Sequence, residues 1–334
     1  MSYFSKDPLQ IIAFQSYGTA DYLYLRGRAI EDENIDLEGK GFFKLIANNW
    51  KRFETDEIRN TEITIKLGDS RVFETKTDDN GYFKISEEIM NLQELTNSEG
   101  WLQYEISYRN AVKGRKIQQE NRFPGEMLIS APNASYGVIS DIDDTILHTG
   151  VASTMKWRLL INTFFKRVEK RSPLEGAAAF YHKLHKGTTG NDANPIFYVS
   201  HSPWNLYRYL DYFLTKNNFP KGPILLRNLP NPFKKKVIGE KPQKQKEIID
   251  LLKMYPDLSF ILIGDSGEHD AAIYIEIAEA FPNRIKAIYL RSVKHEKKML
   301  RIKGLFENYK TTPTLLVETS AAAEAHARDK GFIA

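Results

Sequence analysis

A regular succession of short apolar runs and helix-type segments fills the second half of the chain. The runs are GVIS (137–140), IFYVS (196–200), ILL (224–226), FILIG (260–264) and IKAIYL (285–290). Helical periodicity predicts helices between them, over 174–184, 204–214, 244–254 and 271–280. Strands that are apolar throughout and are separated by helices indicate a parallel sheet covered on both faces. We therefore expect a doubly wound α/β domain over residues 131–334.

The first half of the chain has a different pattern. Residues 22–28, 63–67 and 101–108 each alternate apolar with polar side chains, which is typical of antiparallel strands with one solvated face. Residues 75–83 place Asp, Asn and Gly between strand-like residues and predict a hairpin. Together these segments predict a small β-sandwich domain over residues 1–130.

Composition narrows the class of protein. With 334 residues, of which 42% are hydrophobic, the chain can bury a sizeable core and is long enough for two domains. The absence of cysteine excludes disulfides and thiolate chemistry and fits a reducing compartment. Neither a signal peptide nor an apolar stretch of the ~20 residues that span a bilayer is found, so we expect a cytoplasmic protein. A net charge of +4 is too small to imply a nucleic-acid partner.

Chemically active side chains follow the apolar runs or open the helix between two of them. They are Asp141, Asp143, Thr145, Ser200, Lys244, Asp265 and Asp270. Because the carboxyl ends of parallel strands meet at one edge of the sheet, where open α/β sheets bind ligands, we expect these side chains to converge there.

Two other motif readings of these acidic segments fail. A calcium-binding EF-hand loop starting at Asp141 needs Gly at its sixth position and Glu at its twelfth, where the chain has Ile146 and Ala152. The GDSG segment is shared with chymotrypsin-like proteases, but here it is followed by Glu268 and ends a strand of a predicted parallel sheet.

The order of these residues resembles the haloacid-dehalogenase superfamily of aspartyl phosphotransferases. More narrowly, the segments SDIDDTI, YVSHSPWNLY, GPILLR and FILIGDSGEHD resemble the actin-patch-associated phosphatidate phosphatase catalytic domain family. The resemblance covers about residues 124–334 and implies a Rossmann-like fold of the haloacid-dehalogenase type. The first half is similar, more loosely, to the β-sandwich that precedes this domain in bacterial members. Asp144 stands where most superfamily members have Gly, an exchange that the lipid-phosphatase branch shares.

The resemblance implies a role for each catalytic residue. Asp141 is the expected nucleophile, which forms an aspartyl-phosphate intermediate, and Asp143 is the expected general acid and base. Ser200 is expected to donate its hydroxyl to a phosphoryl oxygen, and Lys244 to balance charge on the nucleophile and the transferring group. Lys241 and Lys246 stay open as alternatives to Lys244, since both lie close by in the sequence.

Several carboxylates are tolerable at one point only if a cation lies among them. A set of hard oxygen donors favours Mg²⁺, which keeps some of its waters and bridges to phosphate. By the superfamily pattern, Asp141 and Asp265 would supply carboxylate oxygens, Asp143 its backbone carbonyl, and Asp270 outer support. We therefore expect Mg²⁺ as the cofactor.

The spacing of the motifs bears on the substrate. About 43 residues separate Ser200 from Lys244, and predicted elements already use them, so no large cap domain fits there. An open site suits a phosphate carried on something larger than a metabolite, such as a membrane lipid. The resemblance implies phosphatidate as that lipid, so we expect hydrolysis of phosphatidate to diacylglycerol. The same chemistry on phosphoprotein or on another soluble phosphomonoester, and a non-catalytic lipid-binding adaptor, stay open as alternatives.

Three stretches mix aromatic or apolar residues with lysine and arginine: 42–53, 155–167 and Lys234–Lys236 with the preceding Pro232 and Phe233. Such mixtures occur in segments that contact an anionic membrane surface peripherally. Core-facing helices and a solvated loop are the more common explanation of such stretches, and both interpretations stay open.

Overall fold

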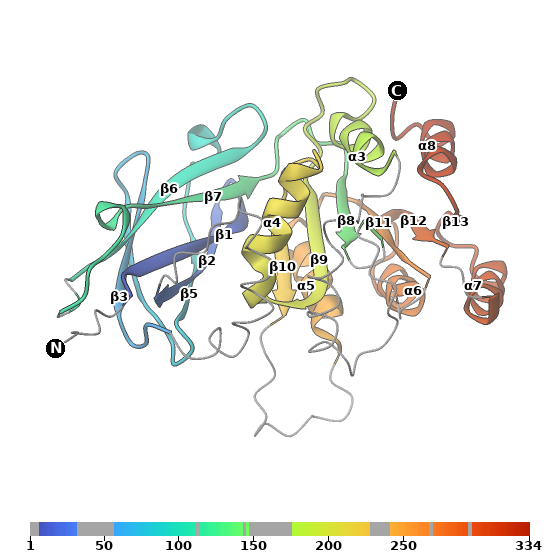
Figure 1. Cartoon of the computed structure of the whole chain (residues 1–334). Coiled ribbons are helices and arrows are strands. Elements are labelled where there is room, and N and C mark those ends of the chain that lie inside the picture. The colour runs from blue at the N-terminus through green and yellow to red at the C-terminus, as the bar shows by residue number, and fades with distance from the viewer. Residues whose placement is uncertain are drawn as a thin grey trace. The chain divides into compact units, whose positions relative to one another are not determined.

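The computed structural model describes residues 7–31, 57–110, 112, 114–142, 145–146, 176–227, 241–266, 270–292 and 296–334. The chain divides into two compact units, Met1–Ser130 and Ala131–Ala334. Figure 1 shows the strands of the first unit and the helices and strands of the second.

In the described part of the first unit, seven strands form one sheet in the order β4-β3-β6-β7-β1-β2-β5. They are β1 (Leu9–Thr19), β2 (Tyr22–Glu31), β3 (Glu62–Leu67), β4 (Val72–Lys76), β5 (Tyr82–Glu88), β6 (Trp101–Tyr108) and β7 (Phe123–Ile129). Alternate residues face the core: Ile63, Ile65 and Leu67 of β3 are buried, whereas Glu62 before them and Lys66 are exposed. The alternation in the sequence therefore predicted β2, β3 and β6 correctly.

The pairing within this sheet differs from the expectation at two places. All neighbouring strands are antiparallel except β1 and β7, which run parallel from Ser16 opposite Met127. The predicted hairpin at residues 75–83 is wrong: β4 pairs with β3 and β5 pairs with β2, so the two strands lie at opposite ends of the strand order. Asp78 does form the expected turn, since its Oδ1 accepts the backbone N–H groups of Asn80 and Tyr82. Turn residues reverse the chain, but they do not choose a strand's partner.

In the described part of the second unit, six strands form a parallel sheet in the order β10-β9-β8-β11-β12-β13. The strands are β8 (Gly137–Asp141), β9 (Ile196–Pro203), β10 (Ile224–Arg227), β11 (Phe260–Asp265), β12 (Ile285–Arg291) and β13 (Thr314–Val317). Every residue of β8 and β11 is buried, because helices cover both faces of the sheet. The prediction of an α/β half with a parallel sheet is confirmed.

The helices of this unit are α3 (Ala177–Lys186), α4 (Tyr207–Lys216), α5 (Gln243–Met254), α6 (Asp270–Ala280), α7 (Glu296–Asn308) and α8 (Ser320–Asp329). In Figure 1, α3 and α8 lie side by side above the strands, and α6 and α7 lie below them. An ion pair between Lys183 and Glu324 joins α3 to α8. The sequence pattern did not predict α7, β13 or α8.

The topology fixes where a ligand site can form. From β8 the chain proceeds outward through β9 to β10, and then crosses back so that β11 lies on the other side of β8. The direction of winding therefore reverses between β8 and β11, and the crevice at such a reversal is the usual ligand site of open α/β sheets. Asp141 and Asp265 are the last residues of these two strands. The interval between β8 and α3, where a cap could be inserted, lies mostly outside the described residues.

Candidate active site

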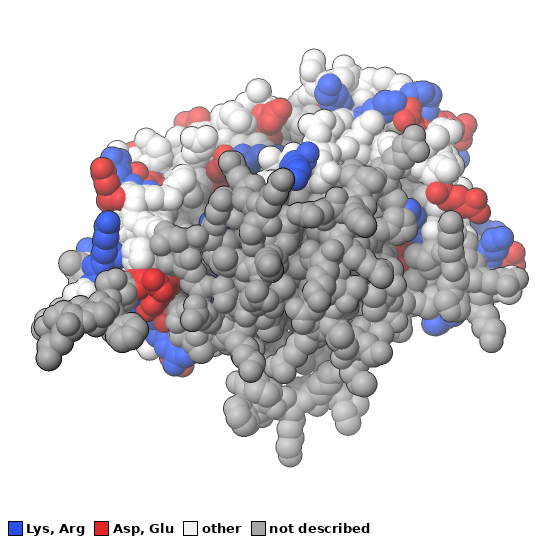
Figure 2. Space-filling view, in the orientation of Figure 1, with Lys and Arg blue, Asp and Glu red and all other residues white. Residues whose placement is uncertain are grey.

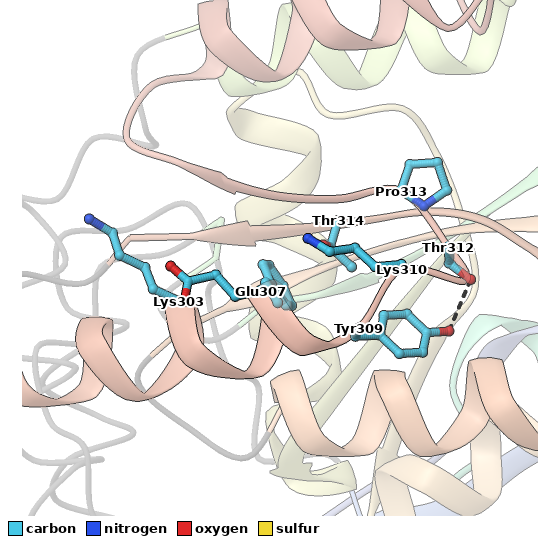
Figure 3. A pocket seen from close by; sticks show the side chains of 8 residues that line it. Lys303, Glu307, Tyr309, Lys310, Thr312, Pro313 and Thr314 are labelled. Carbon is cyan, nitrogen blue, oxygen red and sulfur yellow. Dashed lines mark hydrogen bonds between the residues drawn. The ribbon is translucent and has the colours of Figure 1, made fainter.

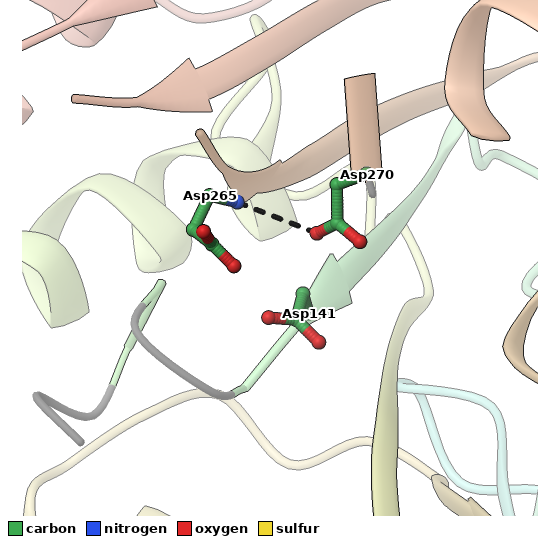
Figure 4. A group of neighbouring side chains, drawn as sticks. All are labelled: Asp141, Asp265 and Asp270. Carbon is green, nitrogen blue, oxygen red and sulfur yellow. Dashed lines mark hydrogen bonds between the residues drawn. The ribbon is translucent and has the colours of Figure 1, made fainter. Parts of the chain in front are cut away.

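Three carboxylates meet at the reversal point of the parallel sheet. Asp141 ends β8 and Asp265 ends β11, and these neighbouring strands pair through Ser140 and Ile263. Asp270 opens α6, five residues after Asp265. All three side chains are buried, and one oxygen of each lies within 4.8 Å of the others. Figure 4 shows the three carboxylates around a common space.

Lys244 lies between two of these carboxylates. Its Nζ is 2.7 Å from Asp141 Oδ1 and donates to Asp270 Oδ1 at 2.5 Å, and its side chain is fully buried. Burial disfavours the charged form of the lysine, but the Asp141 and Asp270 carboxylates outweigh burial and raise the pKa of Lys244 well above its ordinary value. The site therefore holds a permanently charged ammonium beside the Asp141 carboxylate.

The neighbouring lysines have other surroundings. Lys241 is exposed and its Nζ donates to Glu276 at 2.9 Å on α6. Lys246 is partly exposed on α5. Of the three lysines considered from the sequence, Lys244 is therefore the one that contacts the carboxylates.

Asp270 is held rigidly by two different donors. Its Oδ1 accepts from Lys244, and its Oδ2 accepts the backbone N–H of Asp265 at 3.3 Å. The close approach of the Asp270 side chain to the end of β11 needs glycine at position 264, since a Cβ there would clash with Asp270 Oδ2 and lie 2.8 Å from a ring carbon of Tyr274. Asp270 thus braces both Lys244 and the end of β11.

The other predicted residues are placed as follows. Ser200 lies in β9, one residue beyond Val199, which pairs with Asp141 of β8. Its side chain is buried, and its Oγ accepts the backbone N–H of Ser202 at 2.9 Å. Thr145 is buried and its Oγ1 donates to Asp141 Oδ2 at 3.3 Å. Asp143 and Asp144 lie outside the described residues. So do the three stretches considered for membrane contact, 42–53, 155–167 and Lys234–Lys236.

One supporting contact was not foreseen from the sequence. The hydroxyls of Ser140 and Tyr181 are 2.6 Å apart, and both side chains are buried. Tyr181 stacks on Tyr198 of β9 with a ring-centroid distance of 6.4 Å and an interplanar angle of 7°. The signal in the sequence is the single hydroxyl inside the otherwise apolar run before Asp141. A buried hydroxyl needs a hydrogen-bond partner, so a buried Ser140 indicates a polar side chain on the helix that covers its strand.

The acidic cluster fits a divalent cation. Its donors are carboxylate oxygens only, which are the ligands that Mg²⁺ and Ca²⁺ prefer. When ionised, the three carboxylates set three negative charges against the single positive charge of Lys244, which leaves an excess of two. Buried charge without compensation is costly, and a divalent cation cancels this excess. Asp141, Asp265 and Asp270 are therefore able to hold a metal ion.

The described part of the second unit includes the following two cavities. One, of about 590 Å³, opens beside Thr145 between α3 and α8. The other, of about 410 Å³, is lined by Lys303, Tyr309 and Lys310 near the start of β13, where the Tyr309 and Thr312 hydroxyls are 3.1 Å apart (Figure 3). Since parallel strands share their direction, the second cavity lies at the amino edge of the sheet, away from the carboxylates.

The described surface mixes charges of both signs. On the face drawn in Figure 2, lysine and arginine side chains are interspersed with aspartate and glutamate. Among the described helices, none is long and apolar enough to cross a bilayer. The described part of this face therefore has no continuous basic patch that would mark a contact region for an anionic partner.

Comparison with known proteins gives concordant matches. Residues 136–292 match the family model described as phosphatidate phosphatase APP1, catalytic domain. Phosphatidate phosphatase APP1 of Saccharomyces cerevisiae is 31% identical over 249 residues, which are 72% of this chain and 39% of the yeast protein. An uncharacterised protein of Schizosaccharomyces pombe is 31% identical over 157 residues, 47% of this chain and 25% of that protein. The chain thus spans less than half the length of either relative.

The matched range contains the whole carboxylate cluster and Lys244. The resemblance that the motifs indicated is therefore confirmed, and residues 136–292 belong to the family of phosphatidate phosphatase APP1 catalytic domains.

Proposed function

We propose that this chain is a Mg²⁺-dependent phosphatase that hydrolyses phosphatidate to diacylglycerol and inorganic phosphate. The observation that carries the proposal is the buried contact of Asp141 with Lys244, beside Asp265 and Asp270 at the reversal point of the sheet. A carboxylate held by an ammonium in a water-poor site suits nucleophilic attack on phosphorus, because the positive charge also stabilises the transferring phosphoryl group.

The reaction proceeds in two displacements. The Asp141 carboxylate attacks phosphorus, the bond to the glyceride oxygen breaks, and Asp143 gives a proton to the leaving alkoxide. Water then attacks the aspartyl phosphate, Asp143 takes a proton from it, and inorganic phosphate leaves as the Asp141 carboxylate is regenerated. Ser200 donates its hydroxyl to a phosphoryl oxygen, and Lys244 keeps its proton throughout because its pKa is raised.

The metal would be held by Asp141, Asp265 and the backbone of Asp143, with Asp270 in outer support through Lys244 and the backbone of Asp265. When bound, Mg²⁺ supplies charge neutralisation for the phosphoryl oxygens. The two positive charges of the metal ion would cancel the excess of two negative charges that the three carboxylates and Lys244 have together.

The phosphatidate substrate is proposed from the name of the Saccharomyces relative and from the family description. We further propose that residues 131–334 are a phosphatase domain of the haloacid-dehalogenase type and residues 1–130 a separate β domain. The strands of the described first unit form one continuous sheet rather than the two sheets expected of a β-sandwich. Since phosphatidate resides in membranes, the proposed enzyme works in the cytoplasm in peripheral contact with a membrane surface. The basic and aromatic stretches that would make this contact are known from the sequence alone.

Phosphate release tests the proposal. The full chain is assayed on phosphatidate in mixed micelles and on p-nitrophenyl phosphate, with Mg²⁺ and with a chelator. We expect release from phosphatidate that needs the metal, and a loss of at least about 10³-fold in Asp141→Asn because the nucleophile is removed. Circular dichroism and thermal melting verify that Asp141→Asn stays folded.

The same assay separates the alternatives. Release from p-nitrophenyl phosphate alone would favour a soluble phosphomonoester or phosphoprotein as substrate. No release from either compound, with retained binding to phosphatidate vesicles, would favour a lipid-binding adaptor. Wild-type rates in Asp141→Asn would remove Asp141 as the nucleophile.

A further inference from the structure

The cavity of about 590 Å³ begins at a residue that contacts the proposed nucleophile. Thr145, whose hydroxyl contacts Asp141 at 3.3 Å, lies in its wall. Ile263 of β11 is another wall residue. Residues two apart in a strand point to the same face, so Asp265 lies on the face of β11 that Ile263 presents to the cavity. A ligand whose phosphate lies at the carboxylate cluster can therefore extend into this space.

The described wall of the cavity is mostly carbon. Phe180 and Val317 contribute larger apolar groups, and alanines of α3 and α8 leave room between the two helices. Arg291, at the carboxyl end of β12, is the single cation among the described wall residues. Glu318 and Glu324 are the acidic residues of the described wall. A mostly apolar space with a few polar and charged groups is typical of a pocket for a small amphiphilic ligand.

The volume indicates how much of a lipid fits. At about 30 Å³ for a group of the size of a water molecule, 590 Å³ accommodates roughly twenty such groups. This is enough for a glycerol backbone, its ester groups and the first carbons of the acyl chains, but not for two long chains. The remaining carbons must lie outside the cavity.

We propose that the cavity between α3 and α8 binds the glyceride part of the substrate, namely the glycerol backbone, the esters and the first acyl carbons of a diacylglycerol. The proposal rests on the proposed function, since it assigns the leaving group of that reaction. The Arg291 guanidinium complements the ester carbonyl oxygens, and the alanines of the helices determine the width of the pocket.

The test narrows the pocket at exposed positions, so that the core stays intact. Ala321 on α8 and Ala179 on α3 are exposed wall residues on opposite sides of the cavity, and each is changed to Trp in the full chain. Ala325 is also exposed on α8 but is not a wall residue, so Ala325→Trp is the matched control. Circular dichroism verifies that all three variants are folded.

Binding is measured without turnover. The probe is a diacylglycerol with one short nitrobenzoxadiazole-labelled chain, used below its micelle concentration, and its fluorescence reports the Kd. We expect the Kd to rise at least about tenfold in Ala321→Trp and in Ala179→Trp, and to change less than about twofold in Ala325→Trp. In the same variants, the ratio of kcat/KM for phosphatidate to kcat/KM for p-nitrophenyl phosphate is expected to fall at least about tenfold.

Three results would overturn the assignment: no probe binding by the wild-type chain, unchanged Kd in both wall variants, or an equal loss in Ala325→Trp. Phosphate release from phosphatidate by the wild-type chain is measured in parallel. Its absence overturns the proposed function and with it the leaving-group assignment. Normal release with an unchanged Kd in the wall variants overturns the cavity assignment alone.

Discussion

At the scale of single residues, the site depends on one buried cation among acids. Lys244 contacts Asp141 and Asp270 at 2.7 and 2.5 Å without exposure to solvent. Removing one partner of a buried ion pair leaves the other charge uncompensated, and this costs more than the pair itself contributes. Exposed pairs contribute little, so the same substitution at Lys241 gives a matched comparison.

We expect Lys244→Met to lower the free energy of unfolding by about 3–5 kcal/mol and Lys241→Met by less than about 1 kcal/mol, measured by urea denaturation. Added Mg²⁺ should recover part of the loss in Lys244→Met, since a divalent cation also neutralises the acids. Equal stability of the two variants would mean that the buried contact does not hold the site together.

At the scale of elements, Arg284 ties α5 to the strand that carries Asp265. Its guanidinium donates to the carbonyl oxygens of Leu252 at 3.1 Å, Tyr255 at 2.5 Å and Leu258 at 2.9 Å. These carbonyls lie at the end of α5 and in the turn before β11, where the helix leaves its last carbonyl groups without intrahelical partners. Lys244 and Asp265 lie on the two elements that this turn joins.

We expect Arg284→Met to lower the free energy of unfolding by about 2–3 kcal/mol, because charged hydrogen bonds to several carbonyls are lost together. Arg284→Lys should recover only part of the loss, since one ammonium cannot replace the planar fork of the guanidinium. Arg301→Met on exposed α7 is the control. Thermal melts that do not distinguish Arg284→Met from Arg301→Met would contradict this account.

At the scale of the whole molecule, the chain has two compact units, each with a sheet of its own. The first unit has its own core, which includes Leu23, Ile65 and Met127. In the second unit, the cluster of Asp141, Asp265 and Asp270 is supplied by residues of that unit alone. A unit with its own core and its own site is expected to fold and act independently.

We therefore expect residues 131–334, expressed alone, to melt cooperatively and to hydrolyse p-nitrophenyl phosphate with a kcat/KM within about threefold of the full chain. Calorimetry and the phosphate-release assay measure the two quantities. A fragment that folds but is inactive would show that the first unit completes the site.

How much of this could be predicted from the sequence differs between elements. The apolar runs before Asp141 and Asp265 predicted β8 and β11, because a strand that is buried on both faces of a parallel sheet needs apolar side chains at nearly every position. By contrast, β13 has only four residues, mostly half-buried, and α8 has an apolar face made chiefly of alanine, so neither has a strong periodic signal.

Pairing and support were harder to predict than strands. Nothing local in residues 72–88 specifies that β4 and β5 pair with different neighbours, since pairing depends on burial across the whole sheet. The motif spacing brought Asp141, Lys244 and Asp270 under consideration. The choice among three nearby lysines, however, needs the position and rotation of α5, which bury Lys244 and leave Lys246 partly exposed, while Lys241 precedes the helix. The contact of Tyr181 with Ser140 joins residues 41 positions apart, and no short motif encodes it.

The parallel pairing of β1 with β7 has a consequence for synthesis of the chain. Ser16 lies opposite Met127, so the second neighbour of β1 is made more than a hundred residues after β1 itself. Until then, a nascent chain carries β1 with only β2 beside it and one open edge, and contacts of such long separation form slowly. The first unit can therefore close only after β7, its last strand, has left the ribosome.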